Sequence, residues 1–452
     1  MADRQEQYDL VIRDVDILTG DRDQSVIREG YLAVKGGRLA ALGPVGGLAA
    51  EAVAARTISL PGRVATPGFI NVHTHAILSM VRGVAEDMGF APAYTPGVPH
   101  GHDVTPDEAV ALGRLGALEA MMFGSTLIND TYVHQDLTLP AMAGVGLRVY
   151  ACGRIHDVDF SRVHEQIWEV DPKIGERTLG LAVDLAEKYH GADNGRMGVQ
   201  LAAHAPDTCS RELLCAIRDL RDEKGLRVTS HLSQSGIEVE RILEREGMRP
   251  PEFLEDIGLL DDRLLAAHCI FVDDADIRRI GAAGVNAINI AKGNATGGTM
   301  APTTELRRAG ANLTLATDNM HADMVEVMRW ALCVGRLKEQ RVTEFWQPET
   351  VFRMATMNGA KAMGLDSEIG SLEAGKRADL VLFDFRQPHL TPKLDLLGNL
   401  VHTGQGRDVE MVIVEGDIVV EDGRPTKVDP AEIIRDAENA AQALWRRARD
   451  EV

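Results

Sequence analysis

The feature that most restricts the fold of this chain is a series of eight short apolar runs, each followed by a polar or glycine-containing stretch and a helix-like pattern. The runs cover residues 68–75, 125–132, 147–154, 197–204, 226–233, 264–271, 285–292 and 312–319. Parallel strands covered by helices on both faces are almost continuously apolar, and eight strand–helix units are typical of a (β/α)8 barrel. A doubly wound open sheet is the alternative, but no Gly-x-Gly-x-x-Gly follows the first run, so dinucleotide binding has no support.

The segments on either side of this series have a different pattern. The first sixty or so residues, and the segments 378–385 and 409–425 towards the other end, alternate apolar and polar residues around glycine and aspartate, which predicts short strands and turns. The two flanks are expected to form either separate domains or one small sheet domain built from both ends of the chain. The tail, 429–452, has the apolar spacing of one amphipathic helix, which we expect to serve packing or a contact between subunits.

The charge balance and the cysteines narrow the class of protein. Lys and Arg number 48 against 68 Asp and Glu, which gives a formal net charge of −20. Nucleic acid and anionic membranes both require clustered positive charge, so neither is an expected partner. Five scattered cysteines without a Cys-x-x-Cys pair predict neither disulfides nor a thiolate zinc site. No apolar run approaches the ~20 residues of a membrane span, and no signal core is seen at the N-terminus, so we expect a cytoplasmic protein.

Histidines collect at the ends of these runs, where a (β/α)8 barrel places its catalytic groups. The side chains concerned lie in the first, fourth, fifth, sixth and eighth runs and are His73, His75, His204, His231, His268 and Asp318. A His-x-His pair on a strand puts both imidazoles on one face, and neutral imidazoles with a carboxylate suit a borderline divalent ion. The pair alone is a weak signal, but the joint pattern predicts a metal site.

Six segments that span nearly the whole chain resemble the amidohydrolase superfamily, in its cytosine-deaminase-like and s-triazine chlorohydrolase-like branch. They are TPGFINVHTHA (66–76), AAHAPDTCS (202–210), SHLSQSGIE (230–238), LLAAHCIFVDDADI (264–277), LATDN (315–319) and IGSLEAGKRADLVLFD (369–384). The resemblance implies a metal-dependent (β/α)8 catalytic barrel over 66–370. It also implies that the flanks, 1–65 and 371–428, form one composite β-sandwich domain.

The resemblance further implies how the metal site works. The side chains that match the ligands of one divalent ion are His73, His75, His231 and Asp318. Zinc is the default ion, with iron, cobalt or manganese as alternatives. Such an ion lowers the pKa of its water from ~15.7 towards ~7. Asp318 then takes a proton from the water and passes it to the leaving group, and His268 matches a catalytic histidine that polarises the substrate or orients the water.

Contacts with the substrate are expected from the strand ends and from the loops that follow them. The candidates are His204, Gln234, Asn294, Asn319, Met88 and Tyr94. His204 matches a histidine that contacts substrate in the deaminases. Met88 and Tyr94 belong to a long irregular segment after the first run, which we expect to cover a pocket for an apolar substrate, although the same side chains would also suit a subunit interface.

Residue 234 departs from the pattern of this branch. Deaminases of the branch typically carry His-x-x-Glu on strand five, whereas this chain has His231-Leu232-Ser233-Gln234. The amide of Gln234 cannot transfer a proton at any relevant pH. Either Glu238 or another acid substitutes for the missing glutamate, or protonation of the ring is not needed because the leaving group is a good one.

Three functions remain open on the sequence. The first is a hydrolase that uses activated water to displace a halide, thiolate or amine from a planar carbon of a small heterocycle or of an amide- or thiocarbamate-like molecule. The second is a hydrolytic deaminase of a purine, pyrimidine, nucleoside or triazine. The third, from a different class, is an inactive, metal-free barrel scaffold, which ought to lack one of the ligands. The resemblance also implies a homo-oligomer, a dimer or larger.

Overall fold

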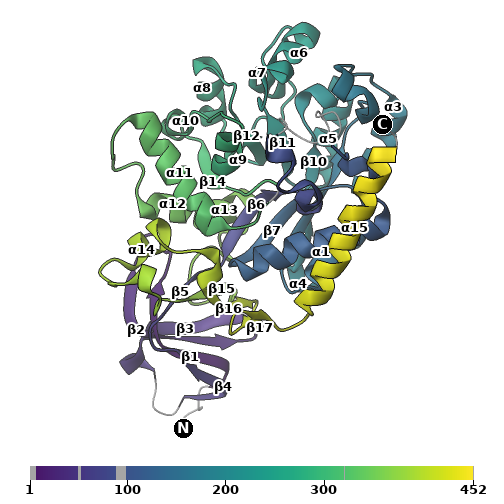
Figure 1. Ribbon diagram of the computed structural model, residues 1–452. Coiled ribbons are helices and arrows are strands. Elements are labelled where there is room, and N and C mark those ends of the chain that lie inside the picture. Colours follow the sequence, from purple (N-terminus) through teal and green to yellow (C-terminus); the bar gives the residue numbers. More distant parts are fainter. Residues whose placement is uncertain (1–6, 49–51, 88–97, 320, 451–452) are drawn as a thin grey trace.

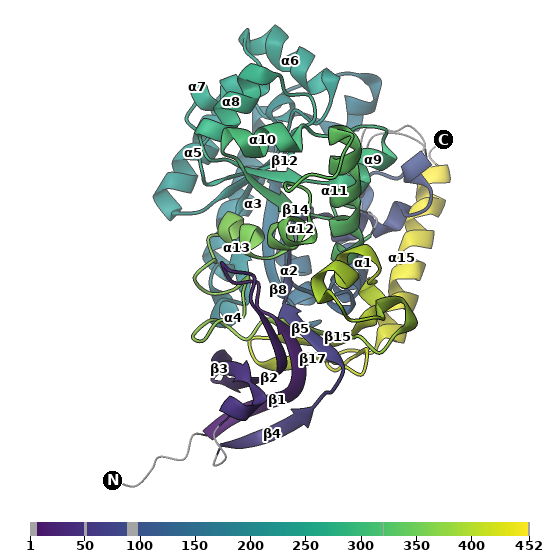
Figure 2. The ribbon, with the colours of Figure 1, turned by 90° about the vertical axis from the view of Figure 1, so that its left-hand side faces the viewer.

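The computed structural model describes residues 7–48, 52–87, 98–319 and 321–450 (Figure 1). Two sheets organise this part of the chain. One is a nearly closed barrel of parallel strands surrounded by helices, and the other is a separate sheet formed from the two ends of the chain (Figures 1 and 2). The predicted (β/α)8 barrel with a small β domain is confirmed, whereas the domain boundaries at 65/66 and 370/371 remain a prediction. No helix in these ranges is both long and apolar enough to cross a bilayer.

The barrel strands follow one another in sequence order and pair in parallel. They are β6 (Phe69–Thr74), β7 (Ser125–Tyr132), β8 (Arg148–Ile155), β10 (Leu201–Ala203), β11 (Val228–Leu232), β12 (Leu264–His268), β13 (Asn286–Asn289) and β14 (Asn312–Leu315), with the short β9 (Met197–Val199) also paired to β8. Each of the eight apolar runs therefore contains a barrel strand. The runs overestimate the length of the later strands because residues that continue the apolar pattern, such as those after β12, have already left the sheet.

The barrel is closed between its first and last strands by a small number of contacts. Thr74 and Asp318 form an isolated parallel bridge. The backbone N–H of His75 donates to the carbonyl of Asp318 at 2.8 Å, and the N–H of Asp318 donates to the carbonyl of His73 at 3.1 Å. One layer deeper, the side-chain amide of Asn71 donates to Thr317 Oγ1 at 2.7 Å. Three of the residues that close the barrel, His73, His75 and Asp318, are thus residues predicted to bind the metal.

Helices cover the outside of the barrel (Figures 1 and 2). The longer ones are α1 (Pro106–Met122), α2 (Gln135–Ala143), α3 (Pro172–Tyr189), α5 (Arg211–Lys224), α6 (Gly236–Glu246), α8 (Asp274–Ala282), α11 (Met324–Glu339) and α12 (Pro348–Ala355). Shorter ones are α4 (Ala192–Gly195), α7 (Pro250–Asp256), α9 (Ala291–Thr296), α10 (Thr303–Ala309), α13 (Met357–Met363) and α14 (Leu396–His402). Capping explains their limits: Ser210 accepts a hydrogen bond from the N–H of Leu213 at the start of α5, and Gly225, at φ +68°, ends it.

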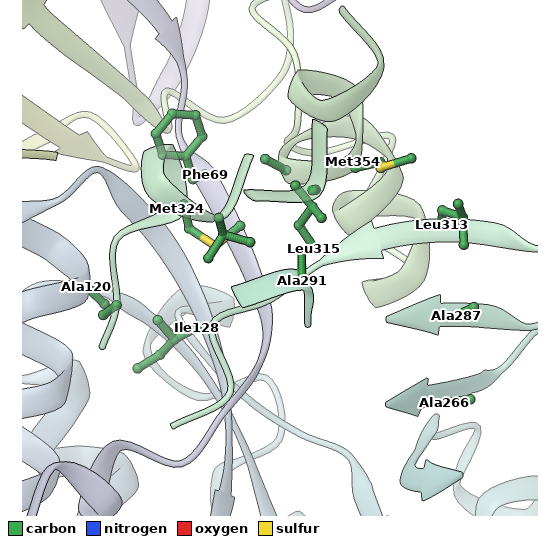
Figure 3. Packing of buried hydrophobic residues seen from close by; sticks show 14 of the residues in the cluster. Phe69, Ala120, Ile128, Ala266, Ala287, Ala291, Leu313, Leu315, Met324 and Met354 are labelled. Atoms are coloured by element: carbon green, nitrogen blue, oxygen red, sulfur yellow. The ribbon is translucent and has the colours of Figure 1, made fainter. Parts of the chain in front are cut away.

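The largest apolar cluster lies between the strands and this helical layer. Figure 3 shows Phe69 of β6, Leu313 and Leu315 of β14, and Met354 of α12 among its members. Phe69 and Leu315 are fully buried. Apolar burial of this kind is the dominant favourable contribution to folding. It holds in place the barrel strands, whose carboxyl ends carry the polar residues predicted to form the site.

The second sheet joins the two ends of the chain. Its strands are β1 (Gln7–Leu18), β2 (Val26–Lys35), β3 (Arg38–Pro44), β4 (Val53–Ser59), β5 (Arg63–Pro67), β15 (Leu380–Asp384), β16 (Val409–Val414), β17 (Asp417–Glu421) and β18 (Arg424–Pro425). β5 pairs antiparallel with β15, so the N-terminal and C-terminal halves form one continuous sheet. This pairing decides between the two arrangements left open by the sequence. The tail forms α15 (Pro430–Asp450), which lies along α1 (Figure 1).

Candidate active site

Five side chains from the ends of four barrel strands, β6, β11, β12 and β14, meet at the carboxyl end of the barrel. His73 Nε2 and His75 Nε2 lie 3.6 Å and 3.4 Å from Asp318 Oδ1. His231 Nε2 is 3.4 Å from His75 Nε2, and His268 Nε2 is 4.0 Å from Asp318 Oδ2. All five residues are at most 8% exposed. The structure therefore brings together the four predicted ligands and the predicted catalytic histidine.

The donor atoms of this cluster fit a divalent cation. Potential ligand atoms of His73, His75 and Asp318 all lie within 4.8 Å of one another, as do those of His73, His231 and His268. Within the described part of the chain, neither ring nitrogen of His73 has a hydrogen-bond partner, although both are buried. A buried polar atom without a partner is costly. Three imidazoles and a carboxylate form a donor set that suits zinc, and other first-row divalent ions as well.

Hydrogen bonds to backbone carbonyls orient two of the imidazoles. Nδ1 of His75 lies 2.5 Å from the carbonyl of Thr131, and Nδ1 of His231 lies 2.6 Å from the carbonyl of His204. Because a carbonyl can only accept, these Nδ1 atoms carry the proton and donate it. Each Nε2 lone pair is then left free to face the centre of the cluster, which is the arrangement found in metal-binding histidines.

Burial keeps the imidazoles of His73, His75 and His231 neutral. Loss of solvation lowers the pKa values of His73, His75 and His231 well below the usual value, and neighbouring imidazoles lower them further. Burial also raises the pKa of Asp318, while His268 and Arg154 oppose that shift. Neutral imidazoles are the form that can act as ligands.

The backbone is strained at three positions around the cluster. Ser233, His268 and Asp318 have φ values of +49°, +74° and +65°. Residues other than glycine adopt this left-handed region at a cost, and such residues gather at functional sites. At His268 and Asp318 the change of backbone direction occurs where the strand pattern ends, and both side chains lie in the cluster.

A pocket of about 960 Å³ opens from the cluster. His268 and Asp318 line it together with three of the predicted substrate contacts, which are Gln234, Asn294 and Asn319. This volume is in the range of sites for small molecules and cofactors. Asn294 also accepts a hydrogen bond from Nδ1 of His268 at 2.9 Å, so it holds the histidine predicted to be catalytic as well as facing the pocket.

The other predicted contacts have different positions. His204 is buried, with its Nδ1 bonded to Thr208 Oγ1 at 2.7 Å and its ring packed against that of His231 at 5.0 Å. It therefore lies beside the cluster, next to the predicted ligand His231. Met88 and Tyr94 fall outside the described residues, so their place over the pocket remains a prediction.

Glu238, one candidate substitute for the strand-five acid, supports the loop after β11. The carboxylate of Glu238 accepts hydrogen bonds from the backbone N–H groups of Ser233 and Gln234, at 2.7 Å and 2.9 Å. Glu238 is fully buried beneath the loop. It supports the turn that presents the Gln234 side chain to the pocket, rather than forming part of the lining itself.

Sequence reasoning missed two further groups that line the same pocket, Asp207 and Trp168. Asp207 belongs to a short 3-10 turn, η7 (Pro206–Thr208), three residues after the strand-four histidine. Trp168 follows η6 (Phe160–Glu165), and its indole Nε1 donates to Asp207 Oδ2 at 3.2 Å. The one sequence signal for Asp207 was its position directly after a strand end; nothing in the sequence indicated that Trp168 would reach it.

Comparisons with known proteins agree with this geometry. The model of the amidohydrolase family matches residues 64–419. The 5-methylthioadenosine/S-adenosylhomocysteine deaminase of Moorella thermoacetica is 35% identical over 419 residues, which cover 90% of this chain and 94% of that protein. The 5'-deoxyadenosine deaminase of Methanosarcina barkeri is 30% identical, with coverage of 96% and 98%.

Solved structures show the same fold. An adenosine deaminase from Xanthomonas campestris with bound zinc superposes with a TM-score of 0.88 at 25% identity and covers 97% of this chain and 99% of that one. The atrazine chlorohydrolase TrzN from Arthrobacter aurescens, complexed with zinc, has a TM-score of 0.87 at 23% identity, with coverage of 96% and 100%.

Proposed function

Because the chain belongs to the amidohydrolase family and is a metal-dependent hydrolase, we propose that it replaces an exocyclic amine of a purine nucleoside or a similar heterocycle with water. The observation that carries this proposal is the convergence of His73, His75, His231 and Asp318 at the base of a pocket of about 960 Å³. The relatives at 30% identity or more that cover most of the chain are deaminases of adenosine-like molecules, which favours an amine as leaving group. The set of ligand residues is complete, which argues against an inactive scaffold.

Each residue of the cluster has a distinct role in this proposal. His73, His75, His231 and Asp318 would hold one divalent ion, zinc in the first instance, and such an ion lowers the pKa of a water molecule it binds. Asp318 accepts a proton from the attacking water and donates it to the leaving amine. His268, held through Nδ1 by Asn294, directs Nε2 towards the side of the pocket where that water attacks.

A second candidate reaction is displacement of a better leaving group, such as chloride or a thiolate. The observation that favours it is Gln234, whose amide lines the pocket but cannot protonate a ring nitrogen. A halide or thiolate leaves without that assistance more readily than an amine does. Both candidates share the metal centre and differ in the group that is released.

The proposal is tested by metal analysis combined with a substrate panel. The purified protein is expected to contain about one divalent ion per chain and to release ammonia from 6-aminopurine nucleosides, or chloride from their 6-chloro analogues, with products identified by mass. Asp318→Asn is expected to lower kcat by about 10²–10⁴-fold, because it removes the group that transfers the proton. His402→Ala changes an exposed histidine of α14 and is expected to keep full activity.

Three results would contradict or change this proposal. A protein that binds no divalent ion, or an Asp318→Asn variant with unchanged turnover, would contradict the proposed metal-dependent hydrolysis. Release of halide or thiol without any release of ammonia would replace the first candidate by the second.

A further inference from the structure

Asp207 is a buried carboxyl group with an unused oxygen next to the substrate pocket. The residue is 5% exposed and lines the same pocket as Gln234, His268 and Asp318. Its Oδ2 accepts the indole N–H of Trp168, but within the described ranges its Oδ1 has no hydrogen-bond partner. Buried polar atoms are normally paired, by protein, water or ligand. A ligand in the pocket would supply the missing partner.

The surroundings of Asp207 favour retention of a proton. Burial raises the pKa of Asp207, while Trp168, Arg245 and Arg241 oppose that shift. Glu238 lies close enough on α6 that burial and the charge of Asp207 both raise its pKa as well. Two carboxyl groups that share a buried region do not readily ionise together. The pair therefore keeps a proton to higher pH than two exposed carboxyl groups would.

Hydrolytic deamination needs such a proton from a second acid besides Asp318. When water adds to a ring carbon, negative charge develops on the adjacent ring nitrogen, and protonation of that nitrogen lowers the barrier. Gln234 cannot supply the proton. Lys292, which also lines the pocket, is bound to Glu326 at 2.9 Å. Among the described lining residues, Asp207 is the buried acid that remains once Asp318 is assigned to the water.

We propose that Asp207 is a catalytic residue that protonates the ring nitrogen of the substrate, in the role that Gln234 cannot perform. This inference rests on the proposed function and identifies the proton donor of the same site. Trp168 is then a positioning residue: its indole fixes Oδ2 of Asp207, and the guanidinium of Arg241, 3.9 Å from the centre of the indole, holds the ring in place.

The protons balance over the reaction. Asp207 gives its proton to the ring nitrogen while the oxygen of water bonds to the ring carbon and a proton of that water passes to Asp318. Asp318 returns this proton to the amine, the bond between carbon and amine breaks, and ammonia leaves. The added hydroxyl then loses its proton to Asp207 and becomes a carbonyl, while the ring nitrogen keeps its hydrogen. One water is consumed and one ammonia is released.

The leaving group provides the test. Asp207→Asn is expected to lower kcat/KM for a 6-aminopurine nucleoside by about 100-fold or more, and for the 6-chloro analogue by less than about tenfold, because chloride depends less on ring protonation. Glu244→Gln alters an exposed carboxyl of α6 outside the described lining of the pocket and is expected to change neither value. Metal content and melting temperature of each variant are measured alongside.

Two further experiments, a rescue and a pH profile, distinguish a catalytic role of Asp207 from a structural one. The double variant with Asp207→Asn and Gln234→Glu is expected to be at least about tenfold more active on the amino substrate than Asp207→Asn alone. Trp168→Phe removes a donor that stabilises the Asp207 carboxylate. It is expected to raise the pKa of Asp207 and move the alkaline limb of the kcat profile to higher pH, and this measurement serves even if Asp207→Asn does not fold.

Several results would overturn the role of Asp207. They are an undiminished rate of Asp207→Asn on the amino substrate, an equal loss on both substrates, and an alkaline limb that stays in place in Trp168→Phe. Failure of the proposed function looks different, because the unaltered protein would then act on neither the amino nor the chloro nucleoside.

Discussion

At the scale of single residues, Asn294 controls the position of His268. Its side-chain oxygen accepts the Nδ1 proton of His268 at 2.9 Å, and both residues line the pocket. Asn294→Ala is expected to lower kcat by about 10–100-fold, as the loss of contacts that orient catalytic histidines does elsewhere, while the metal content stays near one ion per chain. Steady-state kinetics and metal analysis check this expectation.

Thr296→Ala is the matched control for that change. Thr296 lies in the same helix, α9, and lines the same pocket, but its hydroxyl bonds only to the backbone carbonyl of Lys292 among the residues described. A loss of rate in Thr296→Ala as large as in Asn294→Ala would show that the helix as a whole matters, and not the contact with His268.

The site was predictable from the sequence where a strand end determines the position of a side chain. His73, His231 and Asp318 met because parallel strands deliver their carboxyl ends to one rim. Asp207 and Trp168 were not predictable, because their contact depends on how two loops fold against each other. The contact of Asn294 with His268, in addition to its place on the pocket, could not be predicted either. The sequence places Asn294 in a glycine-rich loop but says nothing about its distance from His268.

At the scale of elements, α15 is joined to the start of α1 by an ion pair. The guanidinium of Arg447 contacts both carboxylate oxygens of Glu108 at 2.6 Å. Glu108 also accepts the backbone N–H of Thr105 at 2.9 Å as part of a capping box. The hydrogen bond from Arg447 is the largest cause of the lowered pKa of Glu108.

Glu108→Gln is expected to lower stability at neutral pH by about 1 kcal/mol, because glutamine keeps the cap but loses the charge of a pair whose arginine is partly exposed. A carboxyl whose pKa is lower in the folded than in the unfolded protein stabilises the fold above its unfolded pKa of ~4.3 and loses that effect as the pH falls through the lowered value. Denaturant unfolding at neutral and acid pH should show the difference between the two proteins disappearing in acid.

Glu432→Gln provides the comparison on the same pair of helices. Its contact with Arg114 is longer, at 3.6 Å, and its side chain is 49% exposed. This change is expected to cost less than Glu108→Gln at neutral pH. Equal effects of the two substitutions would mean that the contact of Arg447 contributes nothing specific.

At the scale of the whole molecule, a buried ion pair connects the barrel to the second sheet. Arg148, at the start of β8, lies 3.3 Å from both carboxylate oxygens of Asp379, just before β15, and both side chains are 2% exposed. Asp379 also accepts the backbone N–H of Glu415 at 2.7 Å. Three segments from the two sheets thus meet at one carboxylate.

Asp379→Asn is expected to destabilise the protein by about 3 kcal/mol, since it leaves a buried guanidinium with only the more distant Glu415 as a counter-charge. Chemical denaturation measures this loss. Asp384→Asn, at the last residue of β15, breaks an ion pair with the exposed Arg386 and should cost no more than about 1 kcal/mol. A loss for Asp379→Asn no greater than for Asp384→Asn would contradict a structural role for the buried pair.

The strands of the second sheet could be predicted from residue patterns along the chain, but their pairing could not. Alternation identified its strands in both flanks, but the pairing of β5 with β15 joins residues more than 300 positions apart. Local residue patterns do not specify such a partner, and only the family resemblance favoured a composite domain. The barrel was easier to predict because its neighbouring strands are also neighbours in sequence.

Closure of the barrel at Thr74 and Asp318 has a consequence for the protein before it acquires its ion. The backbone contacts between the first and last strands lie next to the side chains proposed as ligands, so occupancy of the centre and order along this seam are thermodynamically linked. An apo-protein is therefore expected to open at this seam more readily than the protein with its ion bound. Binding of the ion would then stabilise the last contacts that complete the barrel.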